Sequence, residues 1–183
     1  GLLAAWHMGD GMEAPLPVDM PIAMGGGSQR NAIPYYEFAN CKVVNHAIQS
    51  MPIRTSALRA LGAYINVFAI ESFMDELAAV AKLDPIEFRL RHLKDERAIA
   101  VLNAVRAKAN WQPNFKGDGT RGFGVAFARY KNVGNYAAVI VEVSIEENIR
   151  VKNVYAAIDC GLIINPDGVL NQIEGGIVMG LGH

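Results

Sequence analysis

Residues 139–158 read VIVEVSIEENIRVKNVYAAI, and this stretch decides the fold because its apolar side chains alternate with polar ones. A valine stands at every second position of residues 139–143, and residues 150–158 alternate in the same way. Alternation with a period of two is typical of β-strands that bury one face. The stretch therefore predicts two antiparallel strands joined by a turn at residues 146–148.

The neighbouring segments add a third strand and a final helix. Residues 122–130 predict the strand, in which Gly124 would allow close backbone packing. The sequence Asn165-Pro166-Asp167-Gly168 predicts a turn, and the apolar spacing that follows it predicts a helix. A further short strand is predicted over residues 41–44, which read CKVV.

Upstream of the strands, apolar residues recur at helical spacing. The first of three predicted helices has an apolar stripe made of Val67, Ile70, Met74, Leu77 and Ala81. The second begins at Asp84-Pro85, an N-cap residue followed by a proline at the first helical position. The third carries Ala98, Val101, Leu102 and Val105. Helices followed by strands predict an α+β fold with a small mixed or antiparallel sheet.

Composition limits the classes of function. Lys and Arg number 17 and Asp and Glu 18, so a net charge of −1 argues against a nucleic-acid partner. Two cysteines cannot form a disulfide framework or a four-ligand zinc site, and we expect both thiols to be buried or half-buried. No apolar run is long enough to cross a bilayer. The four histidines lie far apart and form no ligand pair.

Domain organisation is expected to be simple. Residues 1–30 are predicted to be an irregular segment rich in glycine and proline, in which Gly25-Gly26-Gly27 is a flexible loop and not a phosphate cradle. Residues 31–183 are predicted to form a partial domain with a helical part at about 64–111, strands at about 121–160 and a turn and helix at 161–183. Both ends are apolar, so we expect a fragment that self-associates through surface buried in a longer parent.

Two segments carry groups suited to binding a ligand. Residues 53–63 contain two arginines among small residues, and residues 159–176 contain several side-chain amides near a helix start. A guanidinium can donate to oxo, thiolate or phosphate acceptors, and a carboxamide can bind the edge of a heterocycle. The alternative is an ion-paired surface arginine and turn-stabilising amides. Glu174 could act as a base, but a surface glutamate on a helix is the favoured interpretation.

Long stretches of the chain resemble one enzyme family. Residues 52–76, PIRTSALRALGAYINVFAIESFMDE, and residues 157–183, AIDCGLIINPDGVLNQIEGGIVMGLGH, resemble the large, molybdopterin-binding subunits of bacterial molybdenum hydroxylases, the family of xanthine dehydrogenases and aldehyde oxidases. The likeness is greatest to the branch that includes isoquinoline 1-oxidoreductase and nicotinate dehydrogenase. The resemblance implies that the α+β fold is part of a molybdopterin-binding domain.

The family's site residues can be carried over to matching positions. Residues 56–63 resemble the family loop Ala-Phe-Arg-Gly-Phe-Gly-Gly, which gives Ala57 and Arg59 the role of cofactor contacts. Leu61 stands where the family has an aromatic residue over the substrate, so it is expected to line the substrate and to accept a different shape. Gln172 matches the glutamine that binds the pterin, with Asn171 in place of a glycine.

The resemblance implies oxidation of an aldehyde or an N-heterocycle by hydroxylation with oxygen from water. The implied cofactor is molybdopterin carrying molybdenum, in its cytosine dinucleotide form, and electrons would pass to 2Fe–2S clusters on a small iron–sulfur partner subunit. No side chain of the chain is expected to bind the metal. The family's catalytic glutamate lies in a Gly-x-Gly-Glu motif that is absent here, so no catalytic residue is assigned and the isolated chain is expected to be inactive.

A cytoplasmic location is expected, with the periplasm as the alternative. A non-catalytic module for subunit contact, with an empty site, is the alternative function.

Overall fold

The computed structural model describes residues 19–46, 48, 58–113 and 117–183. Their centre is a three-stranded antiparallel sheet in the order β1-β2-β3. Its strands are β1 (Arg121–Arg129), β2 (Tyr136–Ile145) and β3 (Ile149–Asp159). The predicted pair of strands and the turn between them are confirmed, and the register shifts by a bulge at Glu142 and Val143.

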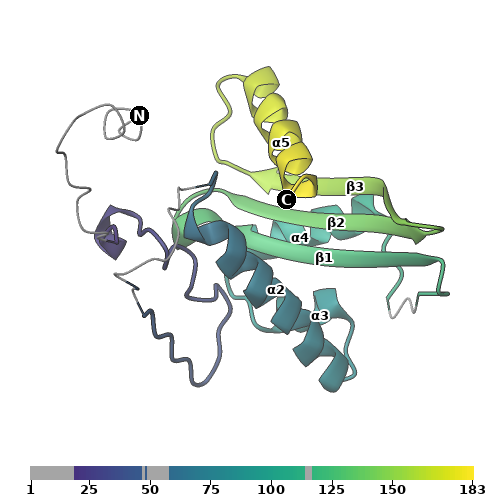
Figure 1. The fold of residues 1–183 in the computed structure, drawn as a ribbon, viewed down its shortest axis with the longest axis horizontal. Helices are drawn as coiled ribbons and strands as arrows, with labels where there is room; N and C mark the ends of the chain where they lie inside the picture. The colour runs from purple at the N-terminus through teal and green to yellow at the C-terminus, as the bar shows by residue number, and fades with distance from the viewer. Residues whose placement is uncertain (1–18, 47, 49–57, 114–116) are drawn as a thin grey trace, which may run out of the picture.

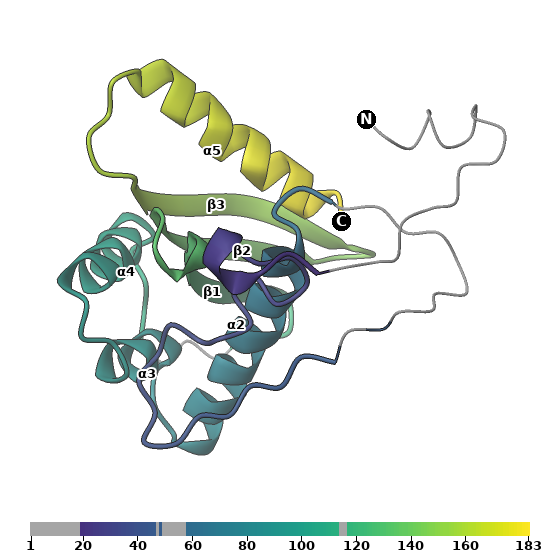
Figure 2. The same ribbon diagram turned by 90° about the vertical axis from the view of Figure 1, so that its left-hand side faces the viewer.

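Helices cover both faces of this sheet. Three helices, α2 (Gly62–Val80), α3 (Pro85–Arg91) and α4 (Glu96–Lys108), lie on one face, and α5 (Pro166–Leu181) lies across the other (Figures 1 and 2). Short 3₁₀ turns occupy Ile22–Met24 and Tyr130–Asn132. The predicted α+β class, with helices preceding a small antiparallel sheet, is confirmed.

Side-chain caps explain where the later helices begin. Asp84 accepts hydrogen bonds from the amides of Ile86 and Glu87, and Asp95 caps α4 in the same manner. Asn165 accepts from the amide of Gly168, and Pro166 occupies the first helical position. Helix α5 therefore begins inside the predicted Asn165–Gly168 turn, because an asparagine followed by proline is also a helix start.

The hydrophobic core lies between the sheet and helices α2–α4. Alternate residues of β2 are buried there, and the predicted face of α4 is fully confirmed, with Ala98, Val101, Leu102 and Val105 all buried. The predicted stripe of α2 is only partly correct, because the buried positions are Ala63, Glu71, Met74 and Ala78. A glutamate occupies a core position, and the reason lies in the next helix.

Arg89 of α3 is completely buried and forms an ion pair with Glu71 at 2.9 Å. Its guanidinium also donates to Asp75 at 2.6 Å and to the carbonyl of Val125 in β1 at 3.1 Å. Glu71 in turn accepts from the Tyr36 hydroxyl and from the amide of Phe127. Burial alone would lower the pKa of Arg89, but the charges of Glu71 and Asp75 raise it above its ordinary value. This network joins α2, α3 and β1.

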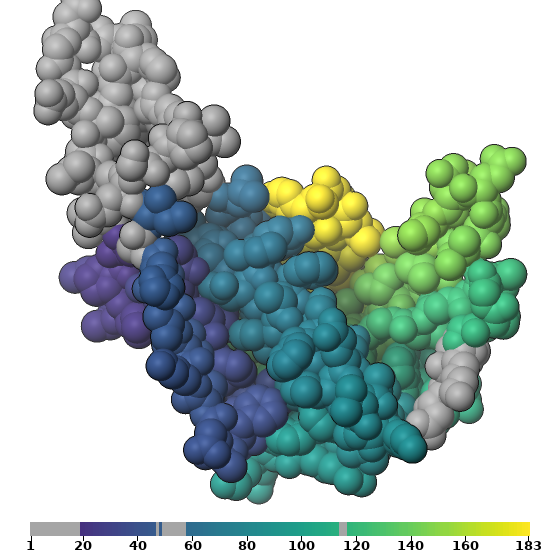
Figure 3. All heavy atoms as spheres, turned by 60° about the horizontal axis from the view of Figure 1, so that its bottom comes forward, coloured from purple at the N-terminus to yellow at the C-terminus, as the bar shows by residue number. Residues whose placement is uncertain are grey.

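The segment before α2 packs along the outside of the helices. Figure 3 shows residues 31–46, in blue, running over the teal surface of α2 and α3, and the amide of Glu37 donates to the carbonyl of His92. Residues 41–44 are exposed and form no strand, so that prediction is wrong; none of the described strands pairs with them. Cys41 and Cys160 are both exposed, which corrects the expectation of buried thiols.

Glycine packing differs from the sequence prediction. A Cβ at Gly124 would have nothing within 4 Å among the described residues, so none of them packs closely enough to require this glycine. Gly62 is the position where two backbones meet, because a Cβ there would lie 2.2 Å from the carbonyl oxygen of Ser28. Its amide also donates to the carbonyl of Gly27 at 3.2 Å. The glycine at position 62 therefore makes room for the backbone of residues 27–28, and not for a ligand.

Gly62→Ala is expected to lower the free energy of unfolding by about 1–3 kcal/mol, because the loop at residues 27–28 must move away from α2. Urea unfolding followed by circular dichroism measures the change. Gly175→Ala is the matched control, because a Cβ there meets nothing within 4 Å and alanine favours a helix by about 1 kcal/mol. Equal effects of the two substitutions would contradict the close approach at Gly62.

Candidate functional site

Arg59 and Gln172, 113 residues apart in the sequence, are in contact. The Arg59 guanidinium donates to Oε1 of Gln172 at 3.1 Å and reaches the sulfur of Met179 at 3.5 Å. Arg59 lies just before α2, and the other two residues belong to α5. The structure thus brings together two of the residues expected to contact a cofactor. The third, Ala57, lies outside the described residues.

The pair presents hydrogen-bond donors to the solvent. A guanidinium has no acceptor, so the Gln172 carboxamide must turn its oxygen toward Arg59 and its NH₂ group away. Both side chains are exposed, and within the described residues the Gln172 NH₂ group has no hydrogen-bond partner. Such a donor set fits a ligand with oxo, thiolate, carbonyl or phosphate acceptors.

The backbone next to Arg59 is strained. Ala60 and Leu61 have φ angles of 72° and 54°, which residues other than glycine and asparagine rarely adopt. The first amides of α2 are already occupied, because Leu61, Gly62 and Ala63 donate to backbone carbonyls. Leu61 is 37% exposed at this turn. The start of α2 therefore offers strained side-chain positions and no free cluster of amides.

Other polar groups of residues 159–176 stabilise the local structure. Arg97 of α4 binds both carboxylate oxygens of Asp159, at 2.7 and 2.6 Å, and this contact lowers the Asp159 pKa to about 2. Asn165 caps α5, and Asn171 donates to the carbonyl of Asp167. Of the amides noted in the sequence, these two are turn-stabilising, and Gln172 reaches across to another segment. Glu174 is exposed on α5, as the favoured interpretation predicted.

A groove of about 1090 Å³ lies between α5 and the outward face of the sheet. Arg59 and Gln172 belong to its lining, together with the exposed Cys160. Most of the remaining lining is apolar and comes from β2, β3 and α5. The donor pair therefore borders a large hydrophobic space.

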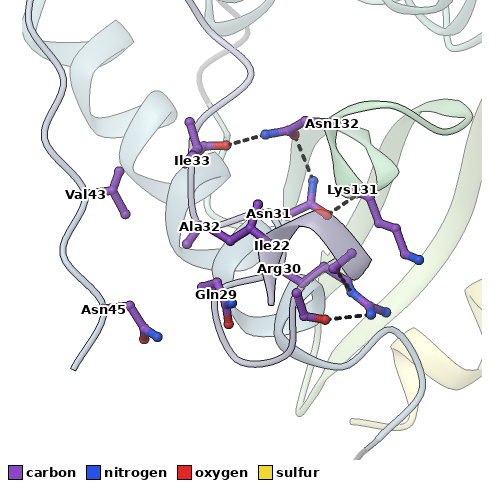
Figure 4. A pocket seen from close by; sticks show the side chains of 12 residues that line it. Ile22, Gln29, Arg30, Asn31, Ala32, Ile33, Val43, Asn45, Lys131 and Asn132 are labelled. Carbon is purple, nitrogen blue, oxygen red and sulfur yellow. Dashed lines mark hydrogen bonds between the residues drawn. The ribbon is translucent and has the colours of Figure 1, made fainter. Parts of the chain in front are cut away.

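A second cavity, of about 350 Å³, lies under the glycine loop (Figure 4). The Arg30 guanidinium is held by the carbonyls of Gly25 and Gly26, and Asn31 binds the backbone at Arg129 and Lys131. The amides of Gly25 and Gly26 donate to the carbonyls of Ile22 and Pro21. Because these amides are already paired, neither of them is free to donate to a phosphate.

Within the part of the chain that the structure describes, no three His, Cys, Asp or Glu side chains gather in a way that could hold a metal ion. The same part contains no helix that is long and apolar enough to span a membrane. The donor pair at the edge of the groove remains the strongest candidate site of the described residues.

Comparison with known proteins gives a consistent result. The family model of the molybdopterin cofactor-binding domain matches residues 53–183, which include both Arg59 and Gln172. A nicotinate dehydrogenase subunit of Pseudomonas putida is 35% identical over 88% of the chain. The beta subunit of isoquinoline 1-oxidoreductase from Brevundimonas diminuta is 34% identical over 68% of it. A membrane-bound aldehyde dehydrogenase (pyrroloquinoline-quinone) of Gluconacetobacter polyoxogenes is 23% identical over 99% of it.

These relatives are much longer than the chain. The aligned region is 15% of the nicotinate dehydrogenase subunit, 16% of the isoquinoline oxidoreductase subunit and 25% of the aldehyde dehydrogenase. The family model nevertheless extends over both segments that form the candidate site, and the nicotinate dehydrogenase and isoquinoline oxidoreductase subunits come from the branch that the sequence motifs indicated. The chain belongs to the molybdopterin cofactor-binding domain family.

Proposed function

We propose that residues 31–183 form part of the catalytic subunit of a molybdenum hydroxylase and help to hold its molybdopterin cofactor. The proposed reaction is the oxidation of an aldehyde or an N-heterocycle, with the oxygen atom taken from water. The observation that carries the proposal is the hydrogen bond between Arg59 and Gln172, two residues assigned to one cofactor from separate segments.

The chain's own residues would act by binding and positioning. Arg59 would donate charge-assisted hydrogen bonds to acceptors of the pterin or its phosphates, and the free NH₂ group of Gln172 would add a donor beside it. Ala57 would contribute its backbone. The bound cofactor supplies the redox chemistry, in which two electrons leave the substrate. Molybdopterin is proposed in place of the quinone named for the third relative, because the matching family model includes both donor residues.

Leu61 is proposed to face the substrate. Its positive φ angle fixes a strained backbone beside Arg59, and such strain occurs at functional sites because the surrounding structure must maintain it. An aliphatic side chain cannot stack on a flat ring as an aromatic one can. This position would therefore favour aldehydes or small heterocycles over purines.

The proposal includes a cytosine dinucleotide form of the cofactor and a small iron–sulfur subunit whose 2Fe–2S clusters accept the electrons. Two of the relatives are named as subunits, which supports an assembly of more than one chain.

We also propose that the isolated 183-residue chain self-associates. Ile65 and Phe73 of α2 are more than half exposed and would drive this association.

The full-length catalytic subunit, co-expressed with its iron–sulfur partner, is expected to contain molybdenum and to reduce a dye with an aldehyde or an N-heterocycle. The isolated 183-residue chain is expected to do neither, because the family's glutamate motif is absent from it and the aligned region is only 15% and 16% of the length of two relatives. Metal analysis and a dye-reduction assay on both proteins test this. A full-length subunit free of molybdenum would refute the proposed function, and turnover by the isolated chain would refute its expected inactivity.

A further inference from the structure

The groove between α5 and the sheet has an apolar floor. Outward-facing side chains of β2 and β3, namely Val139, Val141, Val154, Ala156 and Ile158, line it. The opposite face of β2 packs on α4 and is buried, so both faces of the sheet are apolar. A strand that is apolar on both faces is typical of a sheet covered on both sides. Helix α5 covers this second face only in part, and the groove between them has a volume of about 1090 Å³.

Glycines on the walls of the groove leave room for another polypeptide segment. Gly176 and Gly180 of α5 line it, and a Cβ at either position would meet nothing within 4 Å. The same holds for Gly124 of β1, which lines an adjoining cavity of about 250 Å³. The two cavities share Phe68, Val139 and Val141, so the apolar surface is continuous. Glycines that face empty space allow the close approach of another backbone.

The chemistry of the lining favours a polypeptide over the cofactor as the occupant of this space. Arg59 is the one charged side chain of the lining and the amides of Asn135, Asn165 and Gln172 are its other strong donors, whereas the floor formed by β2 and β3 offers only apolar groups. A cofactor with phosphates and a polar ring needs donors along its length. An apolar peptide segment needs none, provided that its own backbone groups are paired.

The relatives are long enough to supply such a segment. The part of the nicotinate dehydrogenase subunit that aligns with this chain is 15% of its length, and for the isoquinoline oxidoreductase subunit the share is 16%. We propose that the groove is filled by an apolar segment of the same catalytic subunit that lies outside residues 1–183. This inference rests on the proposed function only in placing the chain within a longer subunit.

Cysteine labelling of Ala156→Cys tests the proposal. Residue 156 lies on the floor of the groove, and cysteine adds only a sulfur atom. The labelling rate is measured by peptide mapping in the 183-residue chain and in the full-length subunit, each at two concentrations. We expect the thiol to react at least tenfold more slowly in the full-length subunit. Glu147→Cys, in the exposed turn between β2 and β3, is the control and is expected to react at similar rates in both.

Each outcome is informative. Equal reactivity of Ala156→Cys in both proteins would overturn the proposal, and so would protection in the 183-residue chain that grows with concentration, since the occupant would then be a second copy. Ile177→Cys, on the opposite wall, must give the same pattern as Ala156→Cys. A subunit that contains molybdenum but leaves both thiols reactive would refute the groove proposal alone. Protected thiols in a subunit without molybdenum would refute the proposed function alone.

Discussion

Arg89→Met is expected to lower the free energy of unfolding by about 3–5 kcal/mol, the typical cost of removing one partner from a buried ion pair. The Arg89 side chain is 0% exposed and the Glu71 side chain 6%, so the substitution leaves a carboxylate buried without its counter-charge. It also leaves the carbonyl of Val125 without a donor. Because small domains have stabilities of about 5–15 kcal/mol, this loss removes much of the total. Urea unfolding followed by circular dichroism measures it.

Two controls separate charge from packing. Arg91→Met, two residues away on the exposed side of α3, is expected to change the stability by less than about 0.5 kcal/mol. The double variant Glu71→Gln/Arg89→Met removes the buried charge; the glutamine oxygen can still accept from the Phe127 amide, and its NH₂ group can donate to the hydroxyl oxygen of Tyr36. It is expected to be more stable than Arg89→Met alone. A double variant that is less stable than the single one would mean that packing, and not the uncompensated carboxylate, explains the loss.

Arg59→Ala in the full-length subunit is expected to reduce turnover or molybdenum retention by roughly 10- to 150-fold. Loss of a hydrogen bond from a charged donor costs about 1.5–3 kcal/mol, and each 1.4 kcal/mol corresponds to about a factor of ten. The fold should persist, because Arg59 is exposed and its described contacts are to Gln172 and Met179. Turnover, molybdenum content and circular dichroism are measured on the same preparation.

Arg59→Lys is expected to recover only part of the loss, because lysine keeps the charge and not the planar fork of donors. Arg150→Ala, in the exposed end of the β2–β3 hairpin, is the matched control and should leave both readouts unchanged. If Arg59→Ala kept full molybdenum content and near-normal turnover, the assignment of residues 56–63 as a cofactor loop would be wrong.

The fold could be predicted largely from local sequence. Alternation gave the strands, and helix caps such as Asp84 gave the starts of helices, because both signals depend on residues close together in the chain. Glu71 could not be placed in the core in this way. Apolar periodicity assigns a charged residue to the surface, and the counter-charge that permits burial lies 18 residues away. The strand prediction for residues 41–44 was wrong because local β-type sequence is not enough: a short strand forms only beside a partner strand.

The candidate site could be predicted only in part. From their residue types alone, Arg59 could equally be an ion-paired surface arginine and Gln172 a turn-stabilising amide. Only the resemblance to the family motifs identified them as cofactor contacts. Their proximity depends on the path of α5 across the sheet, which no local pattern encodes. The contact of Arg59 with Met179 was not predicted, because a methionine on an apolar helix gives no sequence signal for it.

The buried network around Glu71 also sets an order of events during synthesis. Arg89 follows Glu71 by 18 residues, so the ion pair can form as soon as α2 and α3 have left the ribosome. Val125, whose carbonyl accepts from Arg89, comes 36 residues later, roughly 2–7 s afterwards at 5–20 residues per second. During that interval the two helices hold a charged pair that β1 has not yet covered. Val125 then adds its carbonyl to the acceptors around Arg89, and the core is completed only when Tyr136, Ala138 and Ile140 of β2 follow.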